Sequence, residues 1–358
     1  MKKLILPFLI LILISSTAVG QLNSVGNIMS TASSSTTDAS KLFGAYLKPY
    51  ANAFGADLNG GWYNTAKAHK ILGFDLTFTI NTAFVPKADK TYDVSKLGLA
   101  GTVSGNPIAQ TVAGKNTGGP TLAYNTTVNG NPVTLASFNT PKGTGLPVIP
   151  SPMIQLGIGI VKETELIGRF FPKTNIGDFG SVSEWGFGLK HSIKQWIPAI
   201  KMAPFFHLSF LGGFTQLKAS SKLNLKPEYY TNLNPSITYT GTDKFDNQKM
   251  EMKVNGMTFN IIASFDLPVV TFYGAVGISN TKTTLKLKGD YPVISGTTAK
   301  IEPLIDPLSI EMKSMQGSAT KPRLNAGIKF KMAIFTIHFD YTYANYSVAT
   351  VGLGIRVR

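Results

Sequence analysis

The sequence predicts an all-β protein, a transmembrane up-and-down antiparallel β-barrel with a short helical segment near its N-terminus. Strand-length segments alternate between apolar and polar side chains, as in residues 72–84, LGFDLTFTINTAF, and the side chains of a strand point to two faces in turn. Only 15% of the 358 residues are charged, whereas soluble domains carry about 25%. The chain also ends in three alternating segments with very short gaps, the meander that closes an up-and-down barrel.

Alternation at residues 72–84 fits either a soluble β-sandwich or a membrane barrel, and strand length separates the two. Strands of soluble proteins average about 5 to 6 residues, whereas a membrane-spanning strand needs about 9 to 11. Several alternating runs in this chain reach the longer value. We therefore expect the apolar side chains from Leu72 to Ile80 to face lipid. The polar side chains between them, which we expect to line the lumen, are Asp75, Thr77, Thr79 and Asn81.

Residues 1–20 are predicted to be a secretory signal peptide. Lys2 and Lys3 precede an apolar run at residues 4–14, and small residues occupy positions −3 and −1 of a cut after Gly20. The run is shorter than the roughly 20 residues of a membrane-spanning helix. The chain has no Cys, which excludes a lipoprotein anchor and disulfides. Export combined with a barrel pattern predicts the outer membrane of a Gram-negative bacterium.

Residues 21–56 are predicted to be a leader followed by an amphipathic helical segment. The leader is rich in Ser and Thr, and after it Leu42, Tyr46, Tyr50 and Phe54 recur every four residues on one helical stripe. Pro49 interrupts a continuous helix, so we expect two short pieces. Two placements fit the pattern: the segment packs on the body of the protein, or it plugs the barrel lumen.

Residues 57–358 are predicted to form the barrel, and a count of the alternating runs gives about 12 to 14 strands. Bacterial barrels normally have an even number. Polar stretches rich in Gly, Pro and Asn, at residues 86–152 and 222–249, predict long extracellular loops. Asn129-Gly130 lies between two β-prone runs and predicts a hairpin. Apolar residues at helical spacing from Leu189 to Ile200 predict a short basic helix at the membrane boundary.

The residue patterns favour a barrel without enzyme activity, cofactor or metal. The four histidines are isolated and lack metal-ligand spacing, and dinucleotide and phosphate-binding motifs are missing. Two same-face pairs, His207 with Ser209 and His338 with Asp340, leave open an acyl hydrolase of the Ser–His type. Polar lumen residues are the simpler interpretation. The further lumen-facing candidates are therefore His207, Ser209, Lys329, Lys331, His338 and Asp340.

Other charges also fall on predicted polar faces. Glu163, Glu165 and Arg169 follow a tight turn and are expected in the lumen or at its rim. Lys329 and Lys331 would favour anions in a pore.

Residues 46–86 (YLKPYANAFGADLNGGWYNTAKAHKILGFDLTFTINTAFVP) resemble an uncharacterised family of Bacteroidetes outer-membrane β-barrels, a domain of unknown function. Residues 146–172 (LPVIPSPMIQLGIGIVKETELIGRFFP) and 184–201 (EWGFGLKHSIKQWIPAIK) carry the same resemblance. The order of elements is distantly similar to outer-membrane transporters of long-chain fatty acids. That resemblance implies a monomeric barrel plugged by an N-terminal segment.

These observations favour a passive transporter or channel for small hydrophobic or amphipathic molecules, gated by the N-terminal segment. The alternative is a non-transporting barrel that serves as a scaffold or binds partners through its long loops. Expected partners are outer-membrane lipid, the barrel assembly machinery and a hydrophobic cargo. Nucleic acid is not expected, and a monomer is favoured.

Overall fold

The protein folds as a closed antiparallel β-barrel, which confirms the predicted fold class. The computed structural model describes residues 28–29, 36–128, 130–175, 180–233, 237–295, 300–316 and 322–357. The predicted signal peptide lies outside the described residues, as does most of the predicted leader. Among the described helices, none has the length and apolar character needed to cross a membrane.

Ten strands close the barrel in the described part of the chain, each antiparallel to its neighbours. In chain order they are β1 (Phe74–Phe84), β7 (Val148–Ile160), β8 (Thr164–Asn175), β9 (Ser181–Ser192), β10 (Phe206–Lys222), β11 (Lys249–Asp266), β12 (Val270–Lys288), β16 (Leu324–Met332), β17 (Phe335–Tyr343) and β18 (Val348–Val357). The first and last strands meet, with Phe74 opposite Val357 and Ala83 opposite Val348. This pairing removes the free edges of an open sheet.

The expectation of about 12 to 14 strands is wrong, and strand length explains the error. Strands β10, β11 and β12 contain 17, 18 and 19 residues, well beyond the roughly 9 to 11 that cross a bilayer. A further strand, β15 (Leu308–Gln316), pairs with the same edge of β12 as β16 does, one after the other. The alternating segments that suggested additional barrel strands are therefore extensions of the ten strands, or they form strands such as β15 outside the ring.

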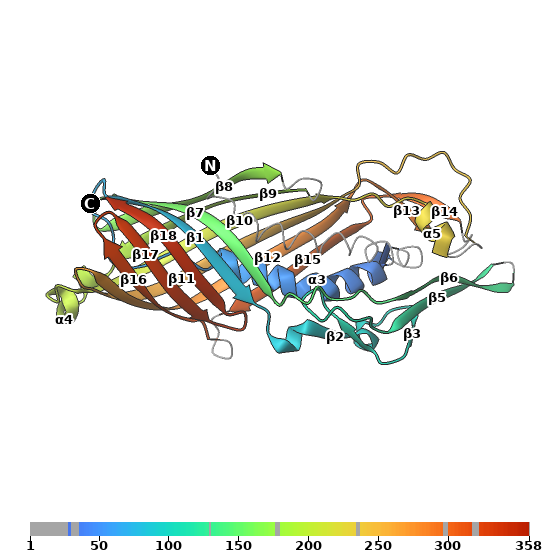
Figure 1. The fold of residues 1–358 in the computed structure, drawn as a ribbon, viewed down its shortest axis with the longest axis horizontal. Helices are drawn as coiled ribbons and strands as arrows, with labels where there is room; N and C mark the ends of the chain where they lie inside the picture. Colours follow the sequence, from blue (N-terminus) through green and yellow to red (C-terminus); the bar gives the residue numbers. More distant parts are fainter. Residues whose placement is uncertain are drawn as a thin grey trace.

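Long connections gather at one end of the barrel, which we call the loop end (Figure 1). Its sheets are β2 (Thr91–Asp93) with β4 (Ile108–Gln110), then β3 (Thr102–Ser104) with β5 (Thr121–Val128) and β6 (Asn131–Asn139), and β13 (Asp290–Ile294) with β14 (Ile301–Ile305). Its short helices are η2 (Lys87–Lys90), η3 (Val94–Leu97) and α5 (Glu228–Leu233). Val128 pairs with Asn131, which confirms the hairpin predicted at residues 129–130.

The opposite end, the turn end, has short connections at residues 161–163, 267–269 and 333–334. A longer one holds η5 (Lys194–Trp196) and α4 (Pro198–Lys201). The predicted basic helix is wrong in its first part, because residues 189–192 belong to β9. Leu189 is exposed and Lys190 buried, which is the period of a strand. Bacterial barrels keep short turns in the periplasm, so we expect the loop end to be the extracellular one.

The outer face carries an apolar band whose height matches a bilayer. On β11 the band runs from Met257 to Phe265, and its large apolar side chains are exposed. Its length falls within the roughly 9 to 11 residues that span a membrane. Nearer the loop end the same face of β11 exposes Lys253 and Lys249 instead. On β12 the band ends at Ile278, which pairs with Phe259, so the two strands agree on the membrane edge.

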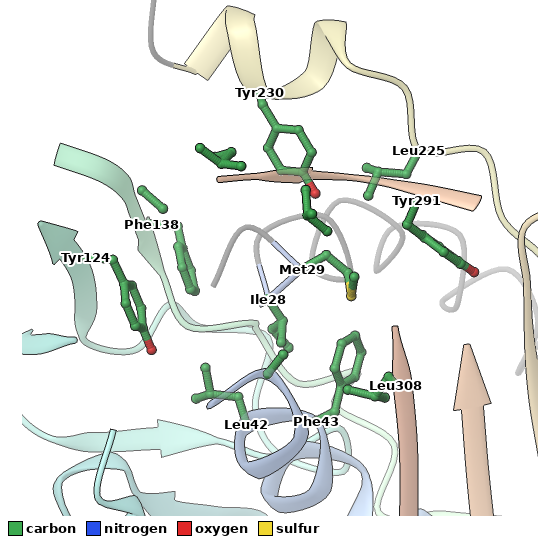
Figure 2. Close-up of a cluster of buried hydrophobic side chains, with 14 of the residues drawn as sticks. Ile28, Met29, Leu42, Phe43, Tyr124, Phe138, Leu225, Tyr230, Tyr291 and Leu308 are labelled. Atoms are coloured by element: carbon green, nitrogen blue, oxygen red, sulfur yellow. The ribbon is translucent and has the colours of Figure 1, made fainter. Parts of the chain in front are cut away.

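The inner face changes from polar within the band to apolar beyond it, the opposite of the outer face. Within the band it is polar and includes the buried side chains of Thr258 and Asn260. Beyond the band it becomes apolar, where β12 turns Leu285 and Leu287 inward. These two leucines belong to the upper cluster, whose other members include Ile28, Met29, Leu42, Phe43, Tyr124, Phe138, Leu225, Tyr230, Tyr291 and Leu308 (Figure 2). A single strand therefore reverses its apolar face where it leaves the membrane.

Helix α3 (Thr36–Leu58) lies inside the ring of strands and contacts β1, β7, β11, β12 and β15 (Figure 1). It is continuous through Pro49, so the predicted break is wrong. The proline removes one helical hydrogen bond, and apolar packing holds the helix on both sides of it. Leu42 and Phe43 are buried in the upper cluster, and Ala53 and Ala56 pack near the loop-end termini of β1 and β7.

The orientation of the barrel is testable because the chain has no Cys of its own. Lys96 is exposed at the loop end and Met202 is exposed at the turn end. We expect a bulky, membrane-impermeant maleimide to label Lys96→Cys in intact cells, and Met202→Cys only after lysis. Labelling in the reverse order would show that the loop end faces the periplasm.

Candidate functional site in the barrel lumen

A segment without regular secondary structure joins the end of α3 to the start of β1. This lumen segment, residues 59–73, begins inside the barrel and ends at the turn end. Asn59, Trp62, Thr65 and Ala66 are all buried. Irregular backbone at membrane depth is stable only where its polar groups find partners inside the protein. The partners of this segment therefore define the candidate site.

Two arginines hold the junction between α3 and the lumen segment. Arg169 on β8 donates from Nη1 to the carbonyl of Leu58 (2.9 Å) and from Nη2 to that of Gly60 (2.7 Å). Arg323, next to β16, donates to the carbonyl of Asn59 (2.8 Å). The last carbonyls of a helix lack partners within it and carry partial negative charge. Both cations therefore bind where the helix terminus needs donors.

Trp62 fills the space on the turn-end side of this junction. Its indole nitrogen donates to the carbonyl of Leu58 (3.2 Å), and the guanidinium of Arg169 lies 3.7 Å from the ring centroid. A guanidinium over a desolvated indole is attracted by about 2 kcal/mol. The ring rests on two glycines of the wall, Gly188 and Gly213, where an added Cβ would lie 2.7 Å from ring atoms. Both glycines are needed for this close approach.

Between Trp62 and the turn end, polar side chains of the wall bind the rest of the lumen segment. Lys329 donates to the side chain of Asn64 (2.8 Å), and Ser209 donates to the carbonyl of Ala66. The Asp266 carboxylate accepts from the hydroxyl of Thr65 at 3.0 Å. Further down, the His69 imidazole lies 2.8 Å from Glu165, which also pairs with Lys190 at 3.0 Å. The lumen segment is thus held by side chains on several different strands.

The structure brings most of the sequence-predicted lumen residues to the inner face. The buried ones are Thr77, Thr79, Asn81, Ser209, Lys329, His338 and Asp340. Three others, Asp75, His207 and Lys331, lie near the turn end and are half-buried. Asn81 donates to the carbonyl of Asp57 at 2.8 Å, and Asp340 accepts from Tyr273 at 3.0 Å. Glu165 and Arg169 are also in the lumen, whereas Glu163 is exposed in a turn.

Neither same-face pair assembles a hydrolase relay among the described residues. The hydroxyl of Ser209 donates to the carbonyl of Ala66, and His207 lies 4.0 Å from Asp266. Neither ring nitrogen of His338 has a hydrogen-bond partner within the described chain. A Ser–His relay requires the base within hydrogen-bonding distance of the nucleophile. The contacts of Ser209, His207 and His338 are therefore those of packed lumen side chains.

Sequence reasoning missed four residues that organise the lumen: Trp62, His69, Lys190 and Arg323. Lys190 was assigned to a helix, although it alternates with the exposed Leu189 as a strand residue would. Arg323 lies directly before β16, at a position to which the sequence patterns assigned no element. His69 lies in a segment without periodicity, so no pattern placed it.

At the loop end α3 is fastened to the connection between β1 and β7. The hydroxyl of Tyr46 donates to the carbonyl of Lys142 (2.9 Å), and that of Tyr124 donates to Asp38 (3.2 Å). Burial raises the pKa of both tyrosines well above the ordinary value, and nearby Asp38 adds to the rise in the pKa of Tyr124. Both hydroxyls therefore stay protonated as donors at any physiological pH.

The contact between Trp62 and the wall predicts an asymmetric response to alanine. Gly213→Ala would drive a Cβ into the indole, whereas Gly168→Ala meets no atom within 4 Å. Overpacking a filled interior costs about 1 to 3 kcal/mol. We expect Gly213→Ala to lower the free energy of unfolding in urea by that amount and Gly168→Ala to leave it nearly unchanged. Equal effects would contradict the packing described.

Comparison with known sequences places the chain in a family. The profile described as a family of unknown function (DUF6588) matches residues 1–357, and the chain belongs to that family. No curated protein matches the sequence significantly.

Several solved structures are similar to this chain at low sequence identity. The translocator domain of the autotransporter NalP from Neisseria meningitidis is 9% identical, with 90% of this chain and 98% of that chain covered and a TM-score of 0.30. The P. putida toluene transporter TodX is 9% identical, with 80% and 67% covered and a TM-score of 0.26. A Pseudomonas aeruginosa FadL homologue is 10% identical, with 79% and 88% covered and a TM-score of 0.20. Such distant similarity does not identify a cargo.

Proposed function

We propose that this member of the DUF6588 family is a passive outer-membrane transporter for small hydrophobic or amphipathic molecules, with α3 and the lumen segment as its gate. One observation carries the proposal: the backbone of the lumen segment pairs with β7 at Leu72 and Gly73, whereas side chains attach residues 61–71 to the wall. Among the described contacts of residues 61–71, no backbone hydrogen bond joins them to a strand. A segment held in this way can leave the lumen without breaking the barrel.

The order of surfaces along the axis supports an amphipathic cargo. A molecule that enters from the loop end after the gate has moved would first meet apolar side chains of the upper cluster. It then meets the polar inner face at the level of the membrane, which includes Thr258, Asn260 and Lys329. A molecule with both apolar and polar parts can exchange contacts with each surface in turn.

Removal of the arginine anchors tests the gate. Arg169 and Arg323 together donate to the carbonyls of Leu58, Asn59 and Gly60. Hydrogen bonds from charged groups contribute about 1.5 to 3 kcal/mol each. Loss of even about 3 kcal/mol shifts a two-state equilibrium about a hundredfold. We expect Arg169→Gln with Arg323→Gln to increase conductance in planar bilayers and uptake of small amphipathic dyes into liposomes.

Controls separate gating from misfolding. Lys96→Gln alters an exposed loop-end charge and should leave conductance unchanged. Heat-modifiable mobility on SDS gels reports whether each variant retains a folded barrel. Deletion of residues 21–56 removes most of α3 and should increase conductance further. A folded deletion variant that conducts no better than the wild type would contradict the gate.

A surface-binding role is the second candidate, favoured by the ordered loop end. The long connection after β1 forms two small sheets and does not project as open loops. Its residues Leu122, Leu135 and Phe138 are buried in the upper cluster. Such a preformed surface suits a binding partner. Under this alternative, cross-linking through Lys96 would recover a partner, while neither the double arginine variant nor the deletion would conduct.

A further inference from the structure

We propose that His69, Asp75 and Glu165 form a binding site for a divalent transition metal, of the class of Zn²⁺, at the turn end of the lumen. The three residues come from the lumen segment, β1 and β8 respectively. One ligand atom from each lies within 4.8 Å of the others. The proposal does not depend on transport.

Two donor atoms of the cluster have the spacing that a metal site requires. Nε2 of His69 lies 3.7 Å from Oδ1 of Asp75, and Nδ1 of His69 lies 2.8 Å from Oε2 of Glu165. Ligand atoms of tetrahedral zinc are about 3.4 Å apart, given bonds of about 2.0 to 2.2 Å. The separation between His69 and Asp75 is therefore close to that of two ligands. Glu165 offers a third ligand atom within 4.8 Å of these two, and its movement toward them would complete a three-residue set with a fourth position for water.

An unsatisfied polar atom in the cluster independently points to a ligand. His69 is only 5% exposed, and its Nε2 has no hydrogen-bond partner in the described chain. A buried polar atom without a partner costs about 1 to 3 kcal/mol. This nitrogen faces Asp75 at a distance too long for a hydrogen bond. A bound cation between them would satisfy both groups.

Contacts around the cluster orient the carboxylates. Oδ2 of Asp75 accepts from the hydroxyl of Thr77 at 2.9 Å, which leaves Oδ1 toward His69. Oε2 of Glu165 accepts from the backbone nitrogen of His69 and pairs with Lys190. Supporting contacts of this kind are typical of metal ligands.

A glycine makes room for the cluster. A Cβ at Gly157 would lie 2.5 Å from Oδ1 of Asp75 and 2.8 Å from Oε1 of Glu165. Two carboxylate oxygens from different strands thus converge over Gly157, a position on β7 that has no side chain. Like charges brought together repel, and Lys190 contacts the other oxygen of Glu165. An alanine at Gly157 would occupy this space.

Metal binding at this position would join the lumen segment to two strands of the wall. His69 is the only member of the cluster carried by the lumen segment. Binding to the folded state alone raises its stability in proportion to the logarithm of metal concentration. The site would therefore strengthen the attachment of the segment at the turn end, opposite the arginines.

The test is calorimetric titration of the full-length, metal-stripped protein in detergent with Zn²⁺. We expect one equivalent to bind the wild type, a loss of affinity of about tenfold or more in His69→Gln and Gly157→Ala, and no loss in His207→Gln. His207 is the matched control, because it is a half-buried histidine at the same end outside the cluster.

Thermal unfolding supplies a second readout. Zn²⁺ should raise the midpoint for the wild type and for His207→Gln, and should not raise it for His69→Gln. If His69→Gln does not fold, Asp75→Asn takes its place with the same expectation. A wild type that binds no Zn²⁺, or the same affinity in wild type, His69→Gln and Asp75→Asn, would overturn the site.

Discussion

The structure depends on satisfying the backbone of an irregular segment inside a membrane barrel. Helix α3 ends within the ring, and the carbonyls of Leu58, Asn59 and Gly60 have no water-filled bulk phase around them. Arg169 and Arg323 supply the donors, and Trp62 packs beneath one guanidinium. Without these partners the helix terminus would carry unpaired polar groups in the lumen. A few side chains of the polar inner face thus complete the hydrogen bonding of the helix terminus.

Single strands of the wall face lipid along one part of their length and water along another. This explains why the strands are long and why their apolar side chains change from the outer face to the inner face. Within the membrane band β11 and β12 face lipid with side chains such as Phe259 and Ile278, and keep threonine and asparagine inside. Beyond the band the same strands face water with lysines and turn Leu285 and Leu287 inward. The upper cluster is therefore a conventional hydrophobic core, built on the continuation of a membrane wall (Figure 2).

Helix α3 joins these two environments, and its two halves are held by different forces. Its first half is buried by apolar packing, where Leu42 and Phe43 enter the upper cluster. Its end is held by directional hydrogen bonds from Arg169. Apolar packing depends on buried area, whereas the lumen contacts depend on charge and geometry. A substitution can weaken one attachment and leave the other in place.

The local alternation of the sequence was sufficient to determine the class of fold and the closure of the ring by the last strands. It also determined the inward orientation of Thr77, Thr79 and Asn81. A period of two can be recognised locally, because it is a property of neighbouring residues. It did not determine strand number, the continuity of α3 through Pro49, or the partners of Trp62. Those depend on residues far apart in the chain: Arg323 contacts Asn59 from 264 positions away, and Glu165 contacts His69 from 96. Only the closed barrel brings such groups together, because the pairing register of each strand decides which side chains meet in the lumen.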